Sequence, residues 1–181
     1  VITVHFDTHG KASKTYCRFL IGCDGANSAV RANAGLSLVD LGFSERWLVI
    51  DTKVIDSSRL PPHNLQICDP ERPTTSVRMG AGRHRWEFML KAEENEDEVS
   101  APASVANLLS GWDVDGAVEL ERTATYTFEA KVANQWMQDG VVIAGDAAHL
   151  MPPFAGQGLC SGIRDVELSL IHISEPTRQE A

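Results

Sequence analysis

The feature that most constrains the fold is a short apolar run, Val141–Ala144, which ends directly in Gly145-Asp146. A run of this length that is apolar on both faces is typical of an inner strand of a parallel sheet. In α/β proteins, ligands bind beyond the carboxyl ends of such strands. We therefore expect the Asp146 carboxylate at a ligand-binding edge, where a fixed acceptor suits a ribose or ribityl hydroxyl.

The residues after this strand form a Pro152-Pro153 loop that leads into a glycine-rich helix start at 156–158. Glycines allow the backbone to approach a ligand closely. The first turn of a helix also offers free N–H groups and a partial positive charge. This stretch, with a helix predicted over 156–167, therefore suits the negative charge of a bound cofactor.

A second turn of the same kind lies about 120 residues earlier, in Leu20-Ile21-Gly22-Cys23-Asp24-Gly25-Ala26-Asn27-Ser28. A strand leads into Asp24-Gly25, and Asn27 or Ser28 can cap a short helix over 28–34. Ser28 and Arg31 share one face of that helix. A carboxylate, a hydroxyl and a guanidinium together suit a pyrophosphate and its ribose. Either turn alone is often only structural, but the pair indicates one dinucleotide site.

The remaining pattern predicts a mixed α/β (α+β) fold, with a mostly β insert carried by a nucleotide-binding domain. Residues 1–7 and 15–21 alternate like the strands of a hairpin, and residues 99–110 have the pattern of an amphipathic helix. Further strands are predicted at 47–54, 66–68, 74–79, 84–90 and 119–130.

Composition narrows the possible partners. The formal net charge of −9 opposes binding to nucleic acid. No run approaches the ~18 apolar residues of a membrane span, and no signal peptide opens the chain, so we expect a cytoplasmic protein.

The chain contains four cysteines, Cys17, Cys23, Cys68 and Cys160, and they lack the spacing of a metal site. We expect buried or half-buried free thiols and no metal.

The two turns, DGANSAVR and GDAAHLMPPFAGQG, resemble the downstream flavin motifs of the single-component FAD-dependent aromatic hydroxylases. Four further stretches are similar to the subgroup of 3-(3-hydroxyphenyl)propionate hydroxylases. They are Trp47–Asp51, Gln66–Thr75, His84–Leu90 and Gln157–Asp165. The resemblance covers about residues 1–165 and implies the para-hydroxybenzoate hydroxylase-like fold.

This resemblance implies a partial FAD-binding, Rossmann-like domain in residues 1–45 and 131–167, with a mostly β substrate domain inserted at 46–130. It implies that Asp146 binds the ribityl chain, and that Asp24 and Arg31 lie by the pyrophosphate and help the nicotinamide substrate to dock. The full set of implied FAD-binding residues is Asp24, Gly25, Ser28, Arg31, Gly145, Asp146, Ala147, Pro153, Gly156 and Gly158.

In that family NADH or NADPH reduces the flavin, and O2 supplies the oxygen that is placed on the ring of a phenolic acid. A homodimer of the full-length protein is compatible with the resemblance. Trp86 and Phe88 alternate on one strand, so they either pack in the core or form an aromatic wall of the substrate pocket; Tyr126 is a further substrate candidate. By residue type alone, Tyr126, His84 and His149 could help to ionise the phenol, although the position of His149 favours a structural role.

Two departures from the family pattern predict a fragment. No strand–GxGxxG–helix unit is present: Gly80-Ala81-Gly82 does not follow a suitable strand. The tail, residues 168–181, looks foreign or disordered, and Pro176 would stop a helix. We therefore expect a chain that does not hold FAD tightly and does not run the reaction alone. Two alternatives stay open: another flavoprotein of the same fold, such as a halogenase or polyprenyl reductase, and a non-catalytic remnant.

Overall fold

The structure, a computed structural model, describes residues 1–174 and divides into two compact units. Unit 1 comprises Val1–Phe43 and the chain from Glu129 onward, and unit 2 comprises Ser44–Phe128. These borders lie within two residues of the predicted ones, 45/46 and 130/131; what each part binds stays a prediction. Two long strands, β4 (Leu38–Val54) and β8 (Val118–Ala133), contribute residues to both units.

The chain opens with an antiparallel hairpin of β1 (Ile2–Thr8) and β2 (Lys11–Cys17). His9 and Gly10 both have positive φ, as a tight two-residue hairpin turn requires. The prediction of one strand over residues 15–21 was wrong. This segment contains the end of β2 and the first two residues of β3 (Leu20–Gly22), because β3 leaves the hairpin and pairs with a distant strand.

Unit 1 contains a three-stranded sheet in the order β3-β10-β9. Its middle strand, β10 (Val141–Ile143), pairs in parallel with β3 and antiparallel with β9 (Met137–Gln138). Ile143 is fully buried and packs with Ala147, Ala148 and Leu36 in a small apolar core. The prediction of a buried strand in a parallel pair is therefore confirmed.

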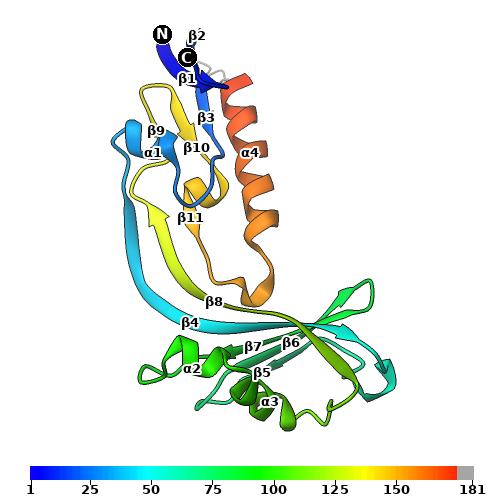
Figure 1. Ribbon diagram of the computed structural model, residues 1–181. Helices are drawn as coiled ribbons and strands as arrows, with labels where there is room; N and C mark the ends of the chain where they lie inside the picture. Colours follow the sequence, from blue (N-terminus) through cyan, green and yellow to red (C-terminus); the bar gives the residue numbers. More distant parts are fainter. Residues whose placement is uncertain (175–181) are drawn as a thin grey trace. The chain divides into compact units, whose positions relative to one another are not determined.

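Two α-helices accompany this sheet: α1 (Ala29–Asn33) follows β3, and α4 (Gly158–Ser174) runs beside β3 and β10 (Figure 1). Ser28 is the N-cap of α1, as predicted. Helix α4 continues beyond the predicted end at Glu167, as far as Ser174. The rest of the predicted foreign tail, including Pro176, lies outside the described residues.

Unit 2 is built on antiparallel strands of a six-stranded sheet in the order β11-β8-β4-β7-β6-β5. Its shorter strands are β5 (Leu65–Ile67), β6 (Thr74–Gly80) and β7 (Arg83–Met89). The outermost strand at the other end, β11 (His149–Leu150), belongs to unit 1 and pairs with β8.

Short helices α2 (Glu96–Ser100) and α3 (Pro102–Ser110) lie on one face of the unit 2 sheet (Figure 1). The prediction of one helix over 99–110 was wrong, because Ala101 before Pro102 is extended and a new helix starts at the proline. The core under these helices combines alternate residues of β4 and β7 with α3. Its members are Leu48, Ile50, Trp86, Phe88, Leu90, Val105, Val114 and Ala117.

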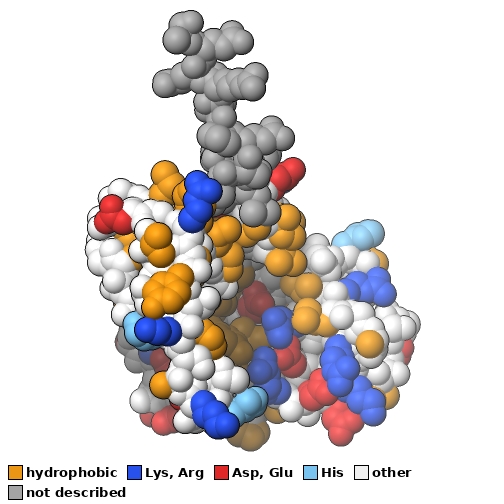
Figure 2. Space-filling view, turned by 90° about the horizontal axis from the view of Figure 1, so that it is seen from above, with side chains coloured by type: hydrophobic (Ala, Val, Ile, Leu, Met, Phe, Trp, Pro, Cys, Tyr) orange, Lys and Arg blue, Asp and Glu red, His pale blue; other side chains and the backbone are white. Residues whose placement is uncertain are grey.

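Basic and acidic side chains are intermixed on the face seen in Figure 2. Within residues 1–174, no helix is both long and apolar enough to cross a membrane.

The four cysteines are free, as expected, but only Cys17 is half-buried. Cys23, Cys68 and Cys160 are exposed, which corrects the expectation of burial. Cys23 and Cys68 directly follow short strands, where the chain leaves the sheet.

Candidate functional site

The two predicted turns leave the same edge of the unit 1 sheet. Strands β3 and β10 are parallel and in register, with Gly22 opposite Ile143. The Ala144 N–H donates to the Gly22 carbonyl at 3.0 Å, which continues the pairing to the first residue of the second turn. The segments that carry Asp24 and Asp146 therefore begin side by side at the carboxyl ends of neighbouring strands, as a shared ligand site requires.

The first turn is held by its own side chains. The Asp24 carboxylate accepts hydrogen bonds from the Ser28 hydroxyl at 2.5 Å and from the Val30 N–H at 3.0 Å. Ser28 Oγ in turn accepts from the Arg31 N–H at 2.9 Å. Partial burial acts to raise the pKa of Asp24, but these hydrogen bonds outweigh it and the pKa is lowered. Both Asp24 and Ser28 thus stabilise the start of α1.

A close packing contact also fixes this turn. A Cβ atom at Gly22 would lie only 2.8 Å from the Cβ of Val30, so α1 packs directly against the end of β3. A larger residue at position 22 would push α1, and the turn before it, away from the sheet.

Arg31 links the two turns directly. Its Nη1 donates to the Ala147 carbonyl at 2.9 Å, and its Nη2 donates to the Ala26 carbonyl at 2.7 Å. The predicted cluster of Asp24, Ser28 and Arg31 is therefore brought together. In the structure its members bond to each other and to backbone groups, and a role toward pyrophosphate stays a prediction.

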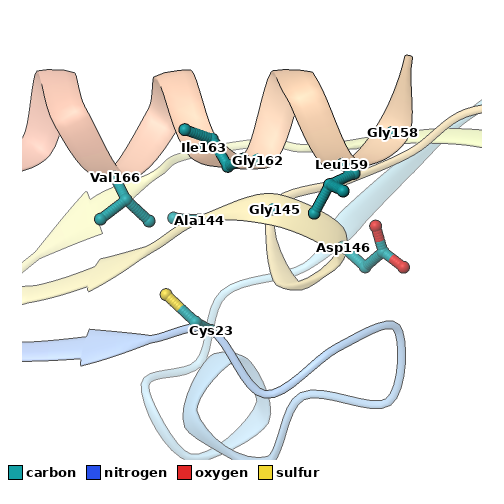
Figure 3. Close-up of a pocket in the computed structure, with 9 residues that line it drawn as sticks. All are labelled: Cys23, Ala144, Gly145, Asp146, Gly158, Leu159, Gly162, Ile163 and Val166. Atoms are coloured by element: carbon teal, nitrogen blue, oxygen red, sulfur yellow. The ribbon is translucent and has the colours of Figure 1, made fainter. Parts of the chain in front are cut away.

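The second turn presents one polar side chain. Residues Gly145–Ala147 form a short 3-10 turn. Ala147 is fully buried in the unit 1 core, whereas the side chain of Asp146 is exposed. In Figure 3 the Asp146 carboxylate points outward, away from the Cys23 sulfur. Of the predicted residues in this turn, Asp146 is thus the one whose side chain can reach a ligand, and Ala147 can contribute only backbone.

A pocket of about 550 Å³ lies between this strand edge and α4. Its wall is mostly apolar, with Asp146 among its lining residues (Figure 3). The lining residues are Cys23, Ala144, Gly145, Asp146, Gly158, Leu159, Gly162, Ile163 and Val166. Leu159 has an apolar side chain, yet the residue is 78% exposed. Sequence reasoning missed Cys23 and the apolar face of α4; the spacing of residues 159, 163 and 166 could have indicated that face.

Three of the four glycines predicted to bind the cofactor face open space, and the fourth, Gly145, lies against Gly162 of α4. A Cβ atom built at Gly25, Gly156 or Gly158 meets nothing within 4 Å. Gly156 has a φ of +61° and ends the 3-10 turn Pro153–Ala155, and α4 begins at Gly158. Open backbone, the N–H groups of a helix start and an exposed carboxylate form a donor and acceptor set that fits the hydroxyls and anionic groups of a dinucleotide.

A partly buried contact between Asp165 and His149, next to the second turn, was not predicted. Asp165 of α4 accepts from the Gly145 N–H at 2.9 Å and lies 2.7 Å from His149 Nε2. Among the candidates for activating a phenol, His149 is thus engaged with a carboxylate. His84 is buried and lies 2.8 Å from the Ser76 hydroxyl. Its pKa is lowered mainly by burial and further by the Arg78 charge.

The three aromatic residues predicted for the substrate site occupy different environments. Trp86 is fully buried and Phe88 is nearly so, both in the core that packs against α3. Their surroundings agree with the core-packing interpretation. Tyr126 is 42% exposed and stacks on Phe128, with ring centroids 6.3 Å apart. Tyr126 is therefore the candidate of the three with a surface available to a ligand, and its role toward substrate stays a prediction.

The face of the unit 2 sheet opposite α3 carries a charged cluster. Asp51 accepts from Arg85 Nε at 2.7 Å, and Arg122 Nη2 lies 3.0 Å from the same carboxylate. Burial acts to raise the pKa of Asp51, but the two arginines outweigh it and the pKa is lowered. The neighbouring Glu87 has a raised pKa, mainly because it is buried.

Fold and site together define a nucleotide-cofactor-binding α/β protein with a β-rich second unit. A family model described as "FAD binding domain" matches residues 2–181. The chain belongs to this FAD-binding family, which confirms the expected cofactor class and fold.

Curated relatives agree with the expected resemblance. The chain is 41% identical over 159 residues to a "probable NADH-specific resorcinol 4-hydroxylase" of Rhodococcus jostii (strain RHA1), which covers 88% of this chain and 30% of the relative. It is 36% identical over 151 residues to a "3-(3-hydroxy-phenyl)propionate/3-hydroxycinnamic acid hydroxylase" of Burkholderia cenocepacia (strain HI2424), which covers 82% of this chain and 27% of the relative. The chain thus spans less than a third of the length of these relatives.

Solved structures show the same fold. The p-nitrophenol 4-monooxygenase PnpA of Pseudomonas putida DLL-E4 superimposes with a TM-score of 0.78 at 24% identity, over 96% of this chain and 46% of that one. Aklavinone-11 hydroxylase, solved with FAD and aklavinone, gives a TM-score of 0.73 at 21% identity, over 93% of this chain and 34% of that one.

Proposed function

We propose that this chain is part of an FAD-dependent monooxygenase that hydroxylates a phenolic ring with a reduced nicotinamide and O2. The observation that carries the proposal is the pairing of β3 with β10, which brings the Asp24 and Asp146 turns to one sheet edge. The relatives named as phenol hydroxylases support the reaction class. The name of the Rhodococcus relative favours NADH over NADPH.

In this proposal the two turns share one cofactor. Asp146 accepts hydrogen bonds from the ribityl hydroxyls, and the backbone at Gly156 and Gly158 lies against the ring system. The partial positive charge at the start of α4 stabilises negative charge on the ring. FAD, when bound, supplies the redox chemistry between the nicotinamide and O2. Asp24 and Arg31 fix the first turn beside the pyrophosphate.

The substrate class follows from the two kinds of relative. One is named for resorcinol, which has no carboxylate, and the other for 3-(3-hydroxyphenyl)propionate, which has one. Both are phenols with a further substituent in the meta position, so a meta-substituted phenol is the substrate class we propose. A phenolic acid such as 3-(3-hydroxyphenyl)propionate remains the leading substrate within this class.

Cofactor binding is tested on the chain itself. FAD is titrated into ¹⁵N-labelled protein, and the backbone amides of 145–147 and 156–158 are followed by NMR. We expect these amides to shift, and Asp146→Asn to weaken binding about tenfold, as for the loss of one charge-assisted hydrogen bond. Asp139→Asn is the matched control: Asp139 is exposed in the turn before β10, and asparagine tolerates its φ of +52°. Shifts that are equal in all three proteins would contradict the Asp146 site.

The reaction is tested with this chain in the context of a complete hydroxylase. NADH oxidation is measured with resorcinol, with 3-(3-hydroxyphenyl)propionate and without either phenol. Stimulation by one of them, with a hydroxylated product, supports the proposal. An FAD-loaded protein whose NADH oxidation responds to neither phenol would refute the substrate class while leaving the cofactor site intact.

A further inference from the structure

Next to the exposed Asp146 lies a partly buried set of contacts that no part of the proposed flavin chemistry uses. The Asp165 carboxylate of α4 receives two contacts at a single oxygen, Oδ2. One is the Gly145 N–H at 2.9 Å, and the other is His149 Nε2 at 2.7 Å. The side chains of His149 and Asp165 are only 11% and 12% exposed. We propose that Asp165 is a positioning residue that, with His149, fixes the turn from which Asp146 projects.

The direction of the hydrogen bonds follows from the chemistry of the two side chains. An ionised carboxylate only accepts hydrogen bonds, so in this contact the proton lies on Nε2 of His149, which donates the hydrogen bond to Asp165. His149 Nδ1 is buried and has no hydrogen-bond partner among residues 1–174. The polar contact of the ring with the protein therefore runs through Nε2, on the side that faces Asp165.

Backbone packing explains why the contact can be so close. Gly145 has a φ of +61°, which glycine adopts without strain. A Cβ atom at Gly162 would lie 3.2 Å from the Gly145 Cα, so α4 touches the turn through two glycines. Asp165 lies three residues after Gly162, on the same side of the helix. The glycine contact brings this carboxylate to the Gly145 N–H.

The turn is thus clamped at both ends. Asp165 binds the N–H of Gly145 before Asp146, and Arg31 Nη1 binds the carbonyl of Ala147 after it at 2.9 Å. Between the two clamps, the Asp146 side chain is the one that reaches solvent. If the hydrogen bond from the Gly145 N–H to Asp165 is lost, the Arg31 contact stays in place but Gly145 is free to move. The Asp146 carboxylate then adopts more orientations. The identification of FAD as the ligand of Asp146 rests on the proposed function.

The test combines amide exchange with FAD titration on the ¹⁵N-labelled chain. In the wild type, we expect slow exchange of the Gly145 amide. Asp165→Asn, which keeps the size of the side chain, should speed this exchange about tenfold, since a charge-assisted hydrogen bond is weakened. It should also weaken FAD binding about tenfold, because Asp146 is no longer held in place. Glu167→Gln removes an exposed charge two residues along the same helix and should change neither quantity.

A second pair of variants separates positioning from simple packing. The amide nitrogen of a glutamine reaches about as far as Nε2, and that of an asparagine only about as far as Nδ1. His149→Gln should therefore keep both the Gly145 protection and the FAD affinity, whereas His149→Asn should lose both. A role in packing alone would give equal losses in the two variants and would overturn the proposal.

The outcomes distinguish this inference from the proposed function. An unchanged exchange rate of the Gly145 amide in Asp165→Asn would show that Asp165 does not hold the turn. Faster exchange with unchanged FAD affinity would overturn the positioning of Asp146. If the wild type shows no FAD-induced shifts, the flavin site on this chain is refuted instead, and the exchange rates together with the His149 pair still decide whether Asp165 holds the turn.

Discussion

The contact between α4 and the second turn makes a quantitative prediction about two glycines of the same helix. An alanine at Gly162 places its Cβ atom 3.2 Å from the Gly145 Cα, where backbone cannot move aside easily. Overpacking of this kind costs about 1–3 kcal/mol. Alanine is favoured over glycine within a helix by about 1 kcal/mol, which offsets part of this cost. We therefore expect Gly162→Ala to lower the free energy of unfolding by about 0–2 kcal/mol.

Gly158 provides the matched control for this change. It starts the same helix, its Cβ atom would meet nothing within 4 Å, and its φ is not positive. Gly158→Ala carries only the favourable helix term, so it should be neutral or stabilising by up to about 1 kcal/mol. The difference between the two variants isolates the packing cost, about 1–3 kcal/mol.

Urea unfolding followed by circular dichroism measures both free energies, with unchanged m-values as the check that the same surface unfolds. FAD titration of the same proteins adds a second comparison. Gly158→Ala should weaken FAD binding without loss of stability, because its methyl group occupies the space proposed for the cofactor. If Gly162→Ala is as stable as Gly158→Ala, the close packing of α4 on the turn is wrong. If Gly158→Ala binds FAD as well as the wild type, the cofactor does not approach this backbone.

Three further predictions concern the charged and capping groups. Asp51→Asn should destabilise the chain by about 2 kcal/mol because it leaves a half-buried arginine without its carboxylate. Arg122→Ala should cost less than Asp51→Asn, because the Arg122 side chain is half exposed, and equal losses in urea unfolding would argue against this ranking. Ser28→Ala should cost about 1–2 kcal/mol as the loss of a buried N-cap, and an unchanged melting temperature would show that the cap is dispensable. Asp24, Asp51 and Glu94 have lowered pKa values, so the folded chain binds fewer protons than the unfolded chain; stability should be full above about pH 5 and fall as the pH drops below about 4, and melting temperatures that rise on acidification would contradict this.

Local hydrogen bonds explain why several elements were predictable from the sequence. The Ser28 cap, the first hairpin and the buried strand before Gly145 each depend on residues close together in the chain. The two Asp turns were visible for the same reason, because a strand, a small residue and a carboxylate follow one another in the chain. The family and its cofactor class were inferred from the resemblance of these two turns to the flavin motifs of the aromatic hydroxylases.

Errors arose where distant segments decide the structure. The segment 15–21 divides into two strands because β3 pairs with β10, more than a hundred residues away. Trp86 and Tyr126 were both predicted to be aromatic residues of strands. Trp86 is fully buried under α3, whereas Tyr126 is 42% exposed. Alternation along a strand separates the two faces of a sheet but does not indicate which face a helix will cover.

The sequence by itself determined the class of chain: two carboxylate turns that each follow a strand, in the order typical of flavin-binding proteins. Only the tertiary structure decided that these turns lie on neighbouring parallel strands, that Arg31 joins them and that Asp165 supports the second one from behind. The physical reason is that a turn is specified by adjacent residues, whereas a hydrogen bond between Gly145 and Asp165 exists only after a helix has packed against a sheet. The placement of the Asp146 carboxylate is therefore a property of the packed fold.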